Sequence, residues 1–307
     1  MARVILTGAS GYAGAAVLQT LRADGIEVMT AGRRPEDAIR LDLLNPQAIA
    51  ELRLPQVDAC IHAAAAHEVG CRMDPVSAWT ANVTATRALL TALSHARVGR
   101  VVYLSTFHVY GSPAGEIDEQ CQPVPATDYG MTHLAAEQMV RMYARQVGMR
   151  ATVLRLTNLY GVPASWHTFA RWSLAPFDFA RQAVRDGSIR LLSDGSPVRS
   201  YVSLEQLTGA VRAALKDQLP ELTHVSGQPW RMGDLARLCA EVAGQTLDRT
   251  IDVSLGGVGA EARTGSTETP YRFFSNHWPS EVDEPVMSSR MAKFLRCVVE
   301  HLGGVVR

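Results

Sequence analysis

The sequence predicts an α/β protein with a doubly wound parallel sheet and a smaller C-terminal lobe. In its first half, short apolar segments of strand length alternate with amphipathic segments of helix length. The apolar segments are continuous, which is typical of strands covered by helices on both faces of a sheet. The 307 residues are enough for one large α/β domain with an additional lobe.

The expected elements follow one another in a regular order. Strands are expected over residues 3–6, 27–31, 59–63, 101–105 and 151–156, and helices over residues 13–24, 79–95 and 129–146. In the first of these helices Val17, Leu18 and Leu21 share one face. Further helices are expected over residues 204–215 and 232–242. Residues 253–289 are rich in Gly, Ser, Thr and Pro, and we expect them to form loops.

Composition and charge exclude several classes of protein. Lys+Arg and Asp+Glu are both 30, so the formal net charge of +0 at pH 7 gives no overall attraction to nucleic acid or to an anionic membrane. No apolar run is long enough to span a membrane or to form a signal peptide. The five cysteines are scattered without a CxxC pair, which disfavours disulfides and a metal site and favours the cytoplasm.

A glycine-rich segment, TGASGYAG over residues 7–14, lies between the first strand and the first helix. Its GxxGxxG spacing allows a tight turn and a close approach of the backbone to a pyrophosphate, and the helix N-terminus offers free N–H groups. A plain strand–helix turn is the alternative. We expect a dinucleotide to be bound here by Gly8, Ser10, Gly11, Tyr12, Ala13 and Gly14.

The end of the second strand indicates which dinucleotide is preferred. An NAD-binding site places an acidic residue there to bind the ribose hydroxyls, whereas this chain has Gly32, Arg33 and Arg34. With no carboxylate in this stretch and two guanidinium groups able to bind a 2′-phosphate, we expect Arg33 and Arg34 to favour NADP, with NAD as the second possibility. The alternative is that both arginines form a solvated face.

Motifs along the chain occur in the order of a known family. They are TGASGYAG at 7–14, Asp42-Leu43, HAAA at 62–65, Asn82, LSTFHVYG at 104–111, YGMTHLAAE at 129–137, RLTNLYG at 155–161 and DGSPVRSYV at 194–202. With these motifs the chain resembles the extended short-chain dehydrogenase/reductases, specifically the NAD(P)-dependent epimerase/dehydratase family that modifies nucleotide sugars. The resemblance covers about residues 3–245, and the last 60 or so residues match poorly.

The resemblance implies a domain organisation and further cofactor contacts. Residues 1–160, with return segments near 200–230, would form an NADP-binding Rossmann domain. Residues 161–199 and 231–307 would form the smaller substrate-binding lobe. The family also implies a homodimer through the helices over residues 79–95 and 129–146. The cofactor contacts it implies are Asp42, Leu43, Ala63, Ala64, Ala65 and Asn82.

The family's catalytic Ser/Thr, Tyr and Lys are matched in part. The resemblance assigns Thr106 to the substrate carbonyl oxygen, with Ser105 as its structural neighbour, and Tyr129 to the general acid or base. His133 stands where the family has a lysine that binds the nicotinamide ribose and lowers the pKa of the tyrosine. Tyr129 and His133 are four residues apart on a helix and therefore share one face.

The histidine at position 133 favours one direction of catalysis. Imidazole has an ordinary pKa of about 6.5, against about 10.4 for lysine, so His133 is mostly uncharged at neutral pH. Tyr129 then stays protonated and suited to donating a proton, as carbonyl reduction requires. The NADP preference agrees, and Phe107-His108 replace the acidic pair of family dehydratases. We predict NADPH-dependent reduction of a keto group on a nucleotide-diphospho-sugar.

The resemblance also places residues beside the substrate, namely Thr106, Asn158, Arg199 and His67. Arg199 would bind the diphosphate, for which a guanidinium is well shaped. A surface salt bridge is the alternative for Arg199, and a solvated position is the alternative for His67. His62, on a strand, is expected to be a hydrogen-bonded histidine of the core.

Three other functions stay open on the sequence alone. An epimerase of the same fold would hold NAD tightly and purify with it. A nucleotide-binding protein with impaired catalysis would result if His133 cannot replace the lysine. A reductase of a non-nucleotide carbonyl would bind none of the nucleotides UDP, GDP, CDP and TDP.

Overall fold

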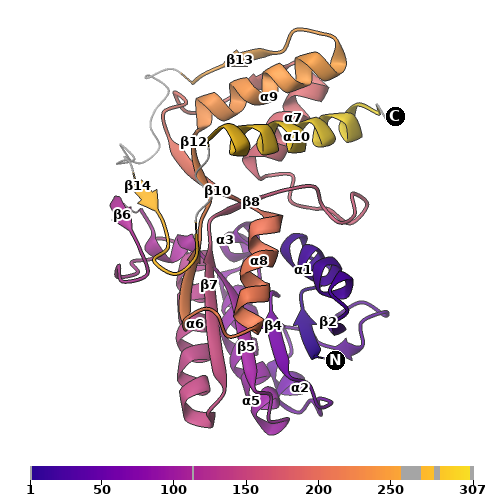
Figure 1. Ribbon diagram of the computed structural model, residues 1–307, viewed down its shortest axis with the longest axis vertical. Coiled ribbons are helices and arrows are strands. Elements are labelled where there is room, and N and C mark those ends of the chain that lie inside the picture. Colours follow the sequence, from indigo (N-terminus) through magenta and orange to yellow (C-terminus); the bar gives the residue numbers. More distant parts are fainter. Residues whose placement is uncertain (1, 113, 257–270, 280–283, 305–307) are drawn as a thin grey trace.

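The computed structural model describes residues 2–112, 114–256, 271–279 and 284–304. Its centre is a parallel sheet of seven strands in the order β11-β7-β5-β4-β1-β2-β3 (Figure 1). This is the strand order of a doubly wound nucleotide-binding fold. The strands are β1 (Arg3–Thr7), β2 (Glu27–Gly32), β3 (Ile39–Arg40), β4 (Ala59–His62), β5 (Arg100–Thr106), β7 (Arg150–Leu156) and β11 (Leu222–Val225).

Helices cover both faces of this sheet. Along β1, Val4 and Leu6 pack into the core beneath α1 (Tyr12–Ala23) and α8 (Leu204–Leu215). Ile5 points to the opposite face, where α2 (Pro46–Ala50), α5 (Ala85–His95) and α6 (Asp128–Val147) form a second core. The α/β doubly wound fold predicted from the sequence is confirmed.

The helix expected over residues 79–95 is interrupted. The chain forms α4 (Pro75–Trp79), then a π-helical turn at Thr80–Thr84, and only then α5. The turn carries Asn82 and turns its side chain into the protein. Such π-turns occur frequently at functional sites, because they redirect one side chain within an otherwise regular helix.

A second group of helices lies beyond the sheet (Figure 1): α7 (Ala175–Asp186), α9 (Met232–Leu247) and α10 (Glu284–Gly303). They share an apolar core that includes Phe177, Leu235 and Phe294. A three-stranded sheet leads into them, made of β8 (Asn158–Tyr160), β10 (Val198–Ser203) and β12 (Gln228–Arg231). Between β10 and β12 the chain returns to the large sheet, where α8 packs against it and β11 pairs with β7.

The remaining elements are short. β9 (Ser188–Arg190) pairs with β13 (Asp252–Ser254), and β6 (Gly115–Ile117) pairs with β14 (Tyr271–Phe273). The single-turn pieces α3 (Glu68–Met73) and the 3₁₀ turn Phe107–Tyr110 follow β4 and β5.

The expectation of loops over residues 253–289 is wrong in three places. Residues 252–254 form β13, residues 271–273 form β14, and α10 begins at residue 284. Strands of three residues are too short to show an alternating pattern. Residues 257–270 and 280–283 of this stretch lie outside the described residues.

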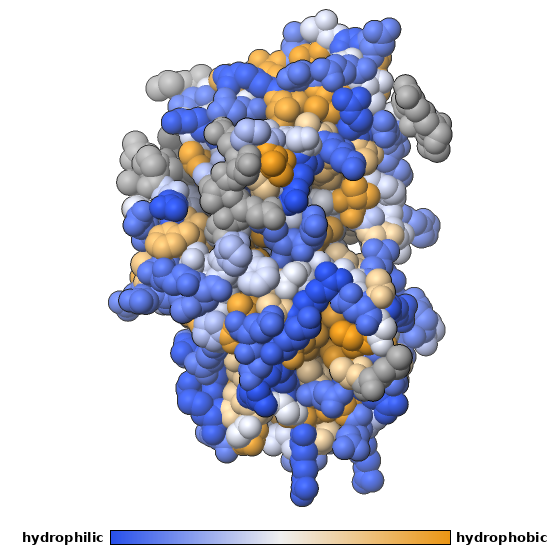
Figure 2. Space-filling view, in the orientation of Figure 1, coloured by the Kyte–Doolittle hydropathy of each residue, from blue (hydrophilic) through white to orange (hydrophobic). Residues whose placement is uncertain are grey.

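The described surface is mixed in character. Hydrophilic residues cover most of the face in Figure 2, and hydrophobic residues lie in separate patches between them. Among the described residues no helix is long and apolar enough to cross a membrane.

Candidate active site

The glycine-rich loop is built by close backbone contacts that only glycine allows. Gly8 has φ +70°, and a Cβ on it would lie 2.7 Å from the backbone nitrogen of Ala64. A Cβ on Gly14 would collide with the carbonyl oxygen of Gly8. Gly11, whose N–H donates to that same carbonyl at 2.9 Å, is the exposed N-cap of α1. The loop is thus compact, and the open helix N-terminus above it fits a pyrophosphate.

A chain of hydrogen bonds holds the end of β4 against this loop. The Thr7 hydroxyl accepts from the amides of residues 63–64, each at 3.2 Å, and donates to Nδ1 of His62 at 2.7 Å. Nε2 of His62 donates to Thr86 at 2.9 Å, and Thr86 donates to the carbonyl of Asn82 at 2.6 Å. Burial lowers the pKa of His62 to about 4, so the ring is neutral. The predicted core histidine is confirmed.

The Asn82 side chain is engaged within the protein. Its Oδ1 accepts from the Ala66 amide at 2.6 Å, and its Nδ2 donates to the Thr132 hydroxyl of α6 at 3.0 Å. The side chain is buried, and it joins the segment after β4 to α6. Asn82 therefore positions residues 63–66, of which Ala63, Ala64 and Ala65 lie partly or fully exposed at the carboxyl edge of the sheet.

Thr106 and Tyr129 come together from two elements. Thr106 ends β5 and is buried, and Tyr129 lies in the first turn of α6, whose N-cap Thr127 accepts from the Gly130 amide at 3.2 Å. A Cβ on Gly130 would collide with the carbonyl oxygen of His108. Glycine at this position therefore lets α6 begin directly against the turn that follows Thr106, which brings Thr106 close enough to Tyr129 to lower the pKa of its phenol.

The surroundings of Tyr129 keep it protonated. Burial raises the pKa of its phenol, while the Arg171 charge and the side-chain hydrogen bond with Thr106 lower it in part. Arg171 lies between β8 and α7, and the sequence analysis did not single it out. Its only sequence signal is a position within the aromatic stretch of residues 161–180.

His133 lies buried beside Tyr129, with ring centroids 4.6 Å apart. Its Nδ1 is 2.8 Å from the Tyr103 hydroxyl, which has no other hydrogen-bond partner among the described residues. The hydroxyl therefore donates to Nδ1, because otherwise its own proton would be buried without an acceptor. The proton of the ring is then on Nε2, and this buried atom has no partner in the described structure. A hydroxyl of a bound ribose would satisfy it.

The His133 ring is uncharged. Burial lowers its pKa to about 3, and the neighbouring His62 and His108 act in the same direction. The family's lysine would bring a positive charge to this place, but His133 brings a neutral hydrogen-bond donor. The positive charge that a lysine would supply is therefore absent from the site.

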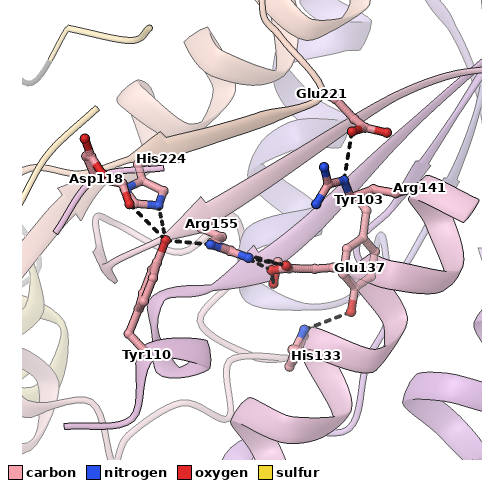
Figure 3. A network of polar contacts seen from close by, with 10 residues as sticks. Tyr103, Tyr110, Asp118, His133, Glu137, Arg141, Arg155, Glu221 and His224 are labelled. Carbon is pink, nitrogen blue, oxygen red and sulfur yellow. Dashed lines mark hydrogen bonds and ion pairs between the residues drawn. The ribbon is translucent and has the colours of Figure 1, made fainter. Parts of the chain in front are cut away.

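A buried polar network links Glu137 and Arg155 to Tyr110 and His224 (Figure 3). The Ser105 hydroxyl donates to Glu137 at 2.5 Å, and Glu137 forms an ion pair of 2.6 Å with Arg155. Arg155 also donates to the Tyr110 hydroxyl at 2.5 Å, which lies 2.7 Å from Nε2 of His224. Glu137 and Arg155 appeared in the sequence analysis only as letters of a motif. Ser105, which precedes Thr106 in β5, is thus bound to this network through Glu137.

The end of β2 differs from the expectation in one respect. A carboxylate does lie there, because the loop after β2 turns Asp37 back over Gly32. Of the two expected guanidinium groups, Arg34 lies 3.8 Å from Glu36, whereas Arg33 is exposed and has no ion-pair partner among the described residues. The sequence analysis missed this carboxylate because Asp37 is five residues beyond the strand.

Asp42 and Leu43 follow β3. Asp42 is exposed, and its side chain accepts from the Leu44 amide at 3.1 Å. Leu43 packs partly buried against the core under α2 and α5. Both therefore lie at the carboxyl edge of the sheet, on the β3 side of the glycine loop.

The Tyr12 side chain points away from the glycine loop. Its hydroxyl donates to the Gly161 carbonyl at 2.7 Å, and its ring packs edge-on against Phe169 and Phe177 at 5.3 and 5.8 Å. It joins α1 to the smaller lobe, so at the expected cofactor site only its backbone, with that of Ala13 and the exposed Ser10, borders the helix N-terminus.

Three of the expected substrate residues lie on separate elements of the fold. Asn158 donates to the Ser200 carbonyl at 3.0 Å and joins β8 to β10. Arg199 is half-buried on β10, and its charge lowers the pKa of His108 in addition to the larger effect of burial. His67 caps α3, accepting from the Gly70 amide at 3.2 Å.

The charge of Arg171 acts on both His67 and Tyr129. Burial and then the Arg171 charge lower the pKa of His67, and the same arginine acts on Tyr129. The two residues therefore share one electrostatic environment.

A parallel doubly wound sheet, a glycine loop after its first strand and a Thr–Tyr pair beside a buried histidine define a nucleotide-dependent enzyme of the short-chain dehydrogenase/reductase type. The chain belongs to the NAD dependent epimerase/dehydratase family, whose model matches residues 4–225. The resemblance identified from the sequence motifs is confirmed.

Individual relatives have several activities. The chain is 31% identical over 236 residues to a UDP-glucose 4-epimerase of Azospirillum brasilense, covering 69% of this chain and 68% of that one. It is 28% identical over 274 residues to a dTDP-6-deoxy-L-talose 4-dehydrogenase (NAD(P)(+)) of Kitasatospora kifunensis, covering 85% of each. The solved structure of RMD from Pseudomonas aeruginosa complexed with NADPH has a TM-score of 0.76 at 22% identity, covering all of both chains.

Proposed function

We propose that this enzyme reduces a keto group on a nucleotide-diphospho-sugar with NADPH. The observation that carries the proposal is the uncharged, buried His133 beside Tyr129, whose pKa is raised. Tyr129 is therefore protonated throughout the neutral range and is ready to act as an acid.

The roles of the side chains follow from their positions. The glycine loop holds the pyrophosphate, and Nε2–H of His133 donates to a ribose hydroxyl. When bound, the cofactor supplies the hydride that the carbonyl carbon receives. Thr106 donates a hydrogen bond to the carbonyl oxygen, and Tyr129 delivers its phenolic proton to the same oxygen as negative charge develops there.

The reverse reaction is handicapped by the same arrangement. Oxidation of an alcohol requires Tyr129 as a phenolate, and only a small fraction is ionised when the pKa lies above its ordinary value of about 10. An epimerase that begins by oxidising its substrate depends on that fraction. A reductase does not.

The substrate class rests on the family and on Arg199. Relatives act on UDP- and dTDP-sugars by their names, and the half-buried Arg199 lies near enough to His108 to influence it. We propose that Arg199 binds the diphosphate, with Asn158 and His67 beside the sugar. Residues 161–199 and 231–307 form the substrate lobe in this proposal. A cytoplasmic homodimer joined through residues 79–95 and 129–146 is part of the same proposal.

The proposal is tested by Tyr129→Phe, with Tyr143→Phe as the matched control on the same helix. Turnover of NADPH with a panel of UDP-, GDP-, CDP- and TDP-linked keto sugars is measured. Tyr129→Phe should lower kcat by about 10²- to 10⁴-fold, the usual contribution of a general acid, and leave NADPH affinity unchanged. Tyr143, whose hydroxyl contacts Thr91, should be replaceable without effect.

Other outcomes select the other functions. Interconversion of two sugar nucleotides without added cofactor, by protein that purifies with NAD, would establish the epimerase. Binding of cofactor without turnover of any sugar nucleotide would establish the catalytically impaired protein. Failure of UDP, GDP, CDP and TDP to bind would remove nucleotide sugars from consideration and leave a simpler carbonyl substrate.

A further inference from the structure

The Asp37 carboxylate occupies the place of a side chain that Gly32 lacks. A Cβ on Gly32 would lie 2.5 Å from Oδ2 of Asp37 and 3.2 Å from its Cγ. The carboxylate therefore lies over the last residue of β2, closer than any other amino acid at position 32 would permit. An Asp at the end of this strand would project its own carboxylate into the same region.

The loop after β2 is built to hold Asp37 there. The Arg34 amide donates to Oδ2 of Asp37 at 2.9 Å, and the chain then returns to the sheet as β3, with Leu41 donating to the Gly32 carbonyl at 2.8 Å. The Arg40 guanidinium donates to the Arg33 carbonyl and closes the turn. Asp37 is thus positioned by its own loop and half-buried.

This position lies next to the glycine loop. β1 and β2 are parallel neighbours in the sheet, with Thr7 opposite Ala31. The next residue of each chain segment, Gly8 and Gly32, therefore lies at the same carboxyl edge. A dinucleotide whose pyrophosphate rests on the glycine loop places its adenosine ribose at the end of β2. The two oxygens of a carboxylate have about four acceptor positions. The Arg34 amide takes one of these positions, which leaves acceptors for ribose hydroxyls.

Charge at this edge is close to balanced. Arg33, Arg34 and Arg40 are matched by Glu36, Asp37 and Asp42, and Arg34 is already 3.8 Å from Glu36. A 2′-phosphate would meet Arg33, but it would also meet the Asp37 carboxylate. Electrostatics here does not exclude the cofactor that lacks the phosphate.

We propose that Asp37 is the acceptor for the adenosine ribose hydroxyls and makes NADH a cofactor of this enzyme alongside NADPH. The inference rests on the proposed function only in requiring a nicotinamide dinucleotide at the glycine loop. Asp37 and Arg33 then act in opposite directions, Asp37 favouring the free hydroxyl and Arg33 the phosphate.

The test is the dissociation constant of NADH and of NADPH, each measured by calorimetry on the full chain and three variants. Asp37→Asn should weaken NADH by about 10-fold, as expected for a lost charge-assisted hydrogen bond, and tighten NADPH. Gly32→Ala should have the same effect on NADH, because the new methyl group displaces the carboxylate without removing it. Glu36→Gln removes a charge from the same loop but leaves the Asp37 carboxylate beside Gly32. It should therefore leave NADH affinity unchanged.

The possible failures can be told apart. If the wild-type chain binds NADPH but not NADH, or if Asp37→Asn and Gly32→Ala leave the ratio of the two constants unchanged, Asp37 is not the ribose acceptor, and the proposed reductase is unaffected. If neither dinucleotide binds, both this inference and the proposed function are overturned. Circular dichroism of each variant confirms that the fold is retained.

Discussion

The Tyr103 hydroxyl and Nδ1 of His133 lie 2.8 Å apart in a buried hydrogen bond. This contact decides which ring nitrogen of His133 carries the proton. It turns a residue with two possible tautomers into a donor at Nε2, beside the phenol of Tyr129. The site thereby offers a buried neutral donor where a lysine would place a charged one.

His133 brings no positive charge to the position of the family's lysine. This difference should be visible in the pH dependence of alcohol oxidation with NADP⁺. In the wild-type enzyme the rate should rise with pH up to at least 9, because it follows the phenolate of Tyr129, whose pKa is raised. His133→Lys should move this limb to lower pH by about 1–2 units, since a nearby positive charge favours the phenolate. His133→Gln is the neutral control and should leave the limb in place. A wild-type limb centred below pH 8 would contradict the assignment.

Acid should destabilise the protein before its carboxyl groups titrate. Burial lowers the pKa of His62 and of His224 to about 4 and that of His133 to about 3, whereas all three titrate near 6.5 in the unfolded chain. Below pH 6.5 the unfolded state therefore binds protons that the folded state does not, and stability falls. The free energy of unfolding should drop by about 1 kcal/mol per histidine between pH 6.5 and 5.5, about 3 kcal/mol for these three rings.

Urea denaturation at pH 7.5, 6.5 and 5.5 measures this loss. His133→Gln should remove about a third of the loss that these three rings cause, whereas His167→Gln, at an exposed position, should retain it. Equal stability at pH 7.5 and 5.5 would show that these rings are protonated in the folded state.

Removing only one partner of the buried Glu137–Arg155 ion pair should lower the free energy of unfolding strongly. Both side chains are almost fully buried, and they are joined by an ion pair of 2.6 Å. Glu137→Ala leaves a buried guanidinium without its partner and should cost about 3–5 kcal/mol of unfolding free energy. The double variant Glu137→Leu/Arg155→Met should recover much of that loss, because it leaves no unpaired charge.

Asp186→Ala provides a surface comparison for the same urea measurement. Its partner Arg185 is exposed, and removal of such a pair should not measurably change stability. A loss at Glu137→Ala no larger than at Asp186→Ala would mean that water compensates the buried arginine.

The sequence predicted those parts of the fold that repeat a local pattern. Continuous apolar strands, amphipathic helices and the glycine spacing depend on neighbours in the chain, and the helix over Leu204–Leu215 has the predicted bounds. The π-turn at Asn82 and the strand at residues 271–273 depend on contacts with distant segments. No local pattern reports those contacts.

At the candidate site, too, local sequence patterns predicted some features, and contacts between distant segments determined the others. Motif order placed Thr106, Tyr129 and His133 together. The sequence could not show that Asp37 folds back over Gly32, that Tyr12 turns toward Gly161, or that the Arg171 charge acts on Tyr129. Each of these is set by the course of a loop rather than by spacing.

The glycine loop should be intolerant of a single methyl group at one position. A Cβ on Gly14 would collide with the backbone oxygen of Gly8, which cannot move aside as a flexible side chain could. Gly14→Ala should therefore distort the loop and weaken NADPH binding by at least about 10-fold, equivalent to about 1.4 kcal/mol. Gly70→Ala is the matched control in α3, because a Cβ there would meet nothing nearer than 3.9 Å. Calorimetry with NADPH on both variants decides the matter: equal affinities would mean that the loop adjusts and does not require its third glycine.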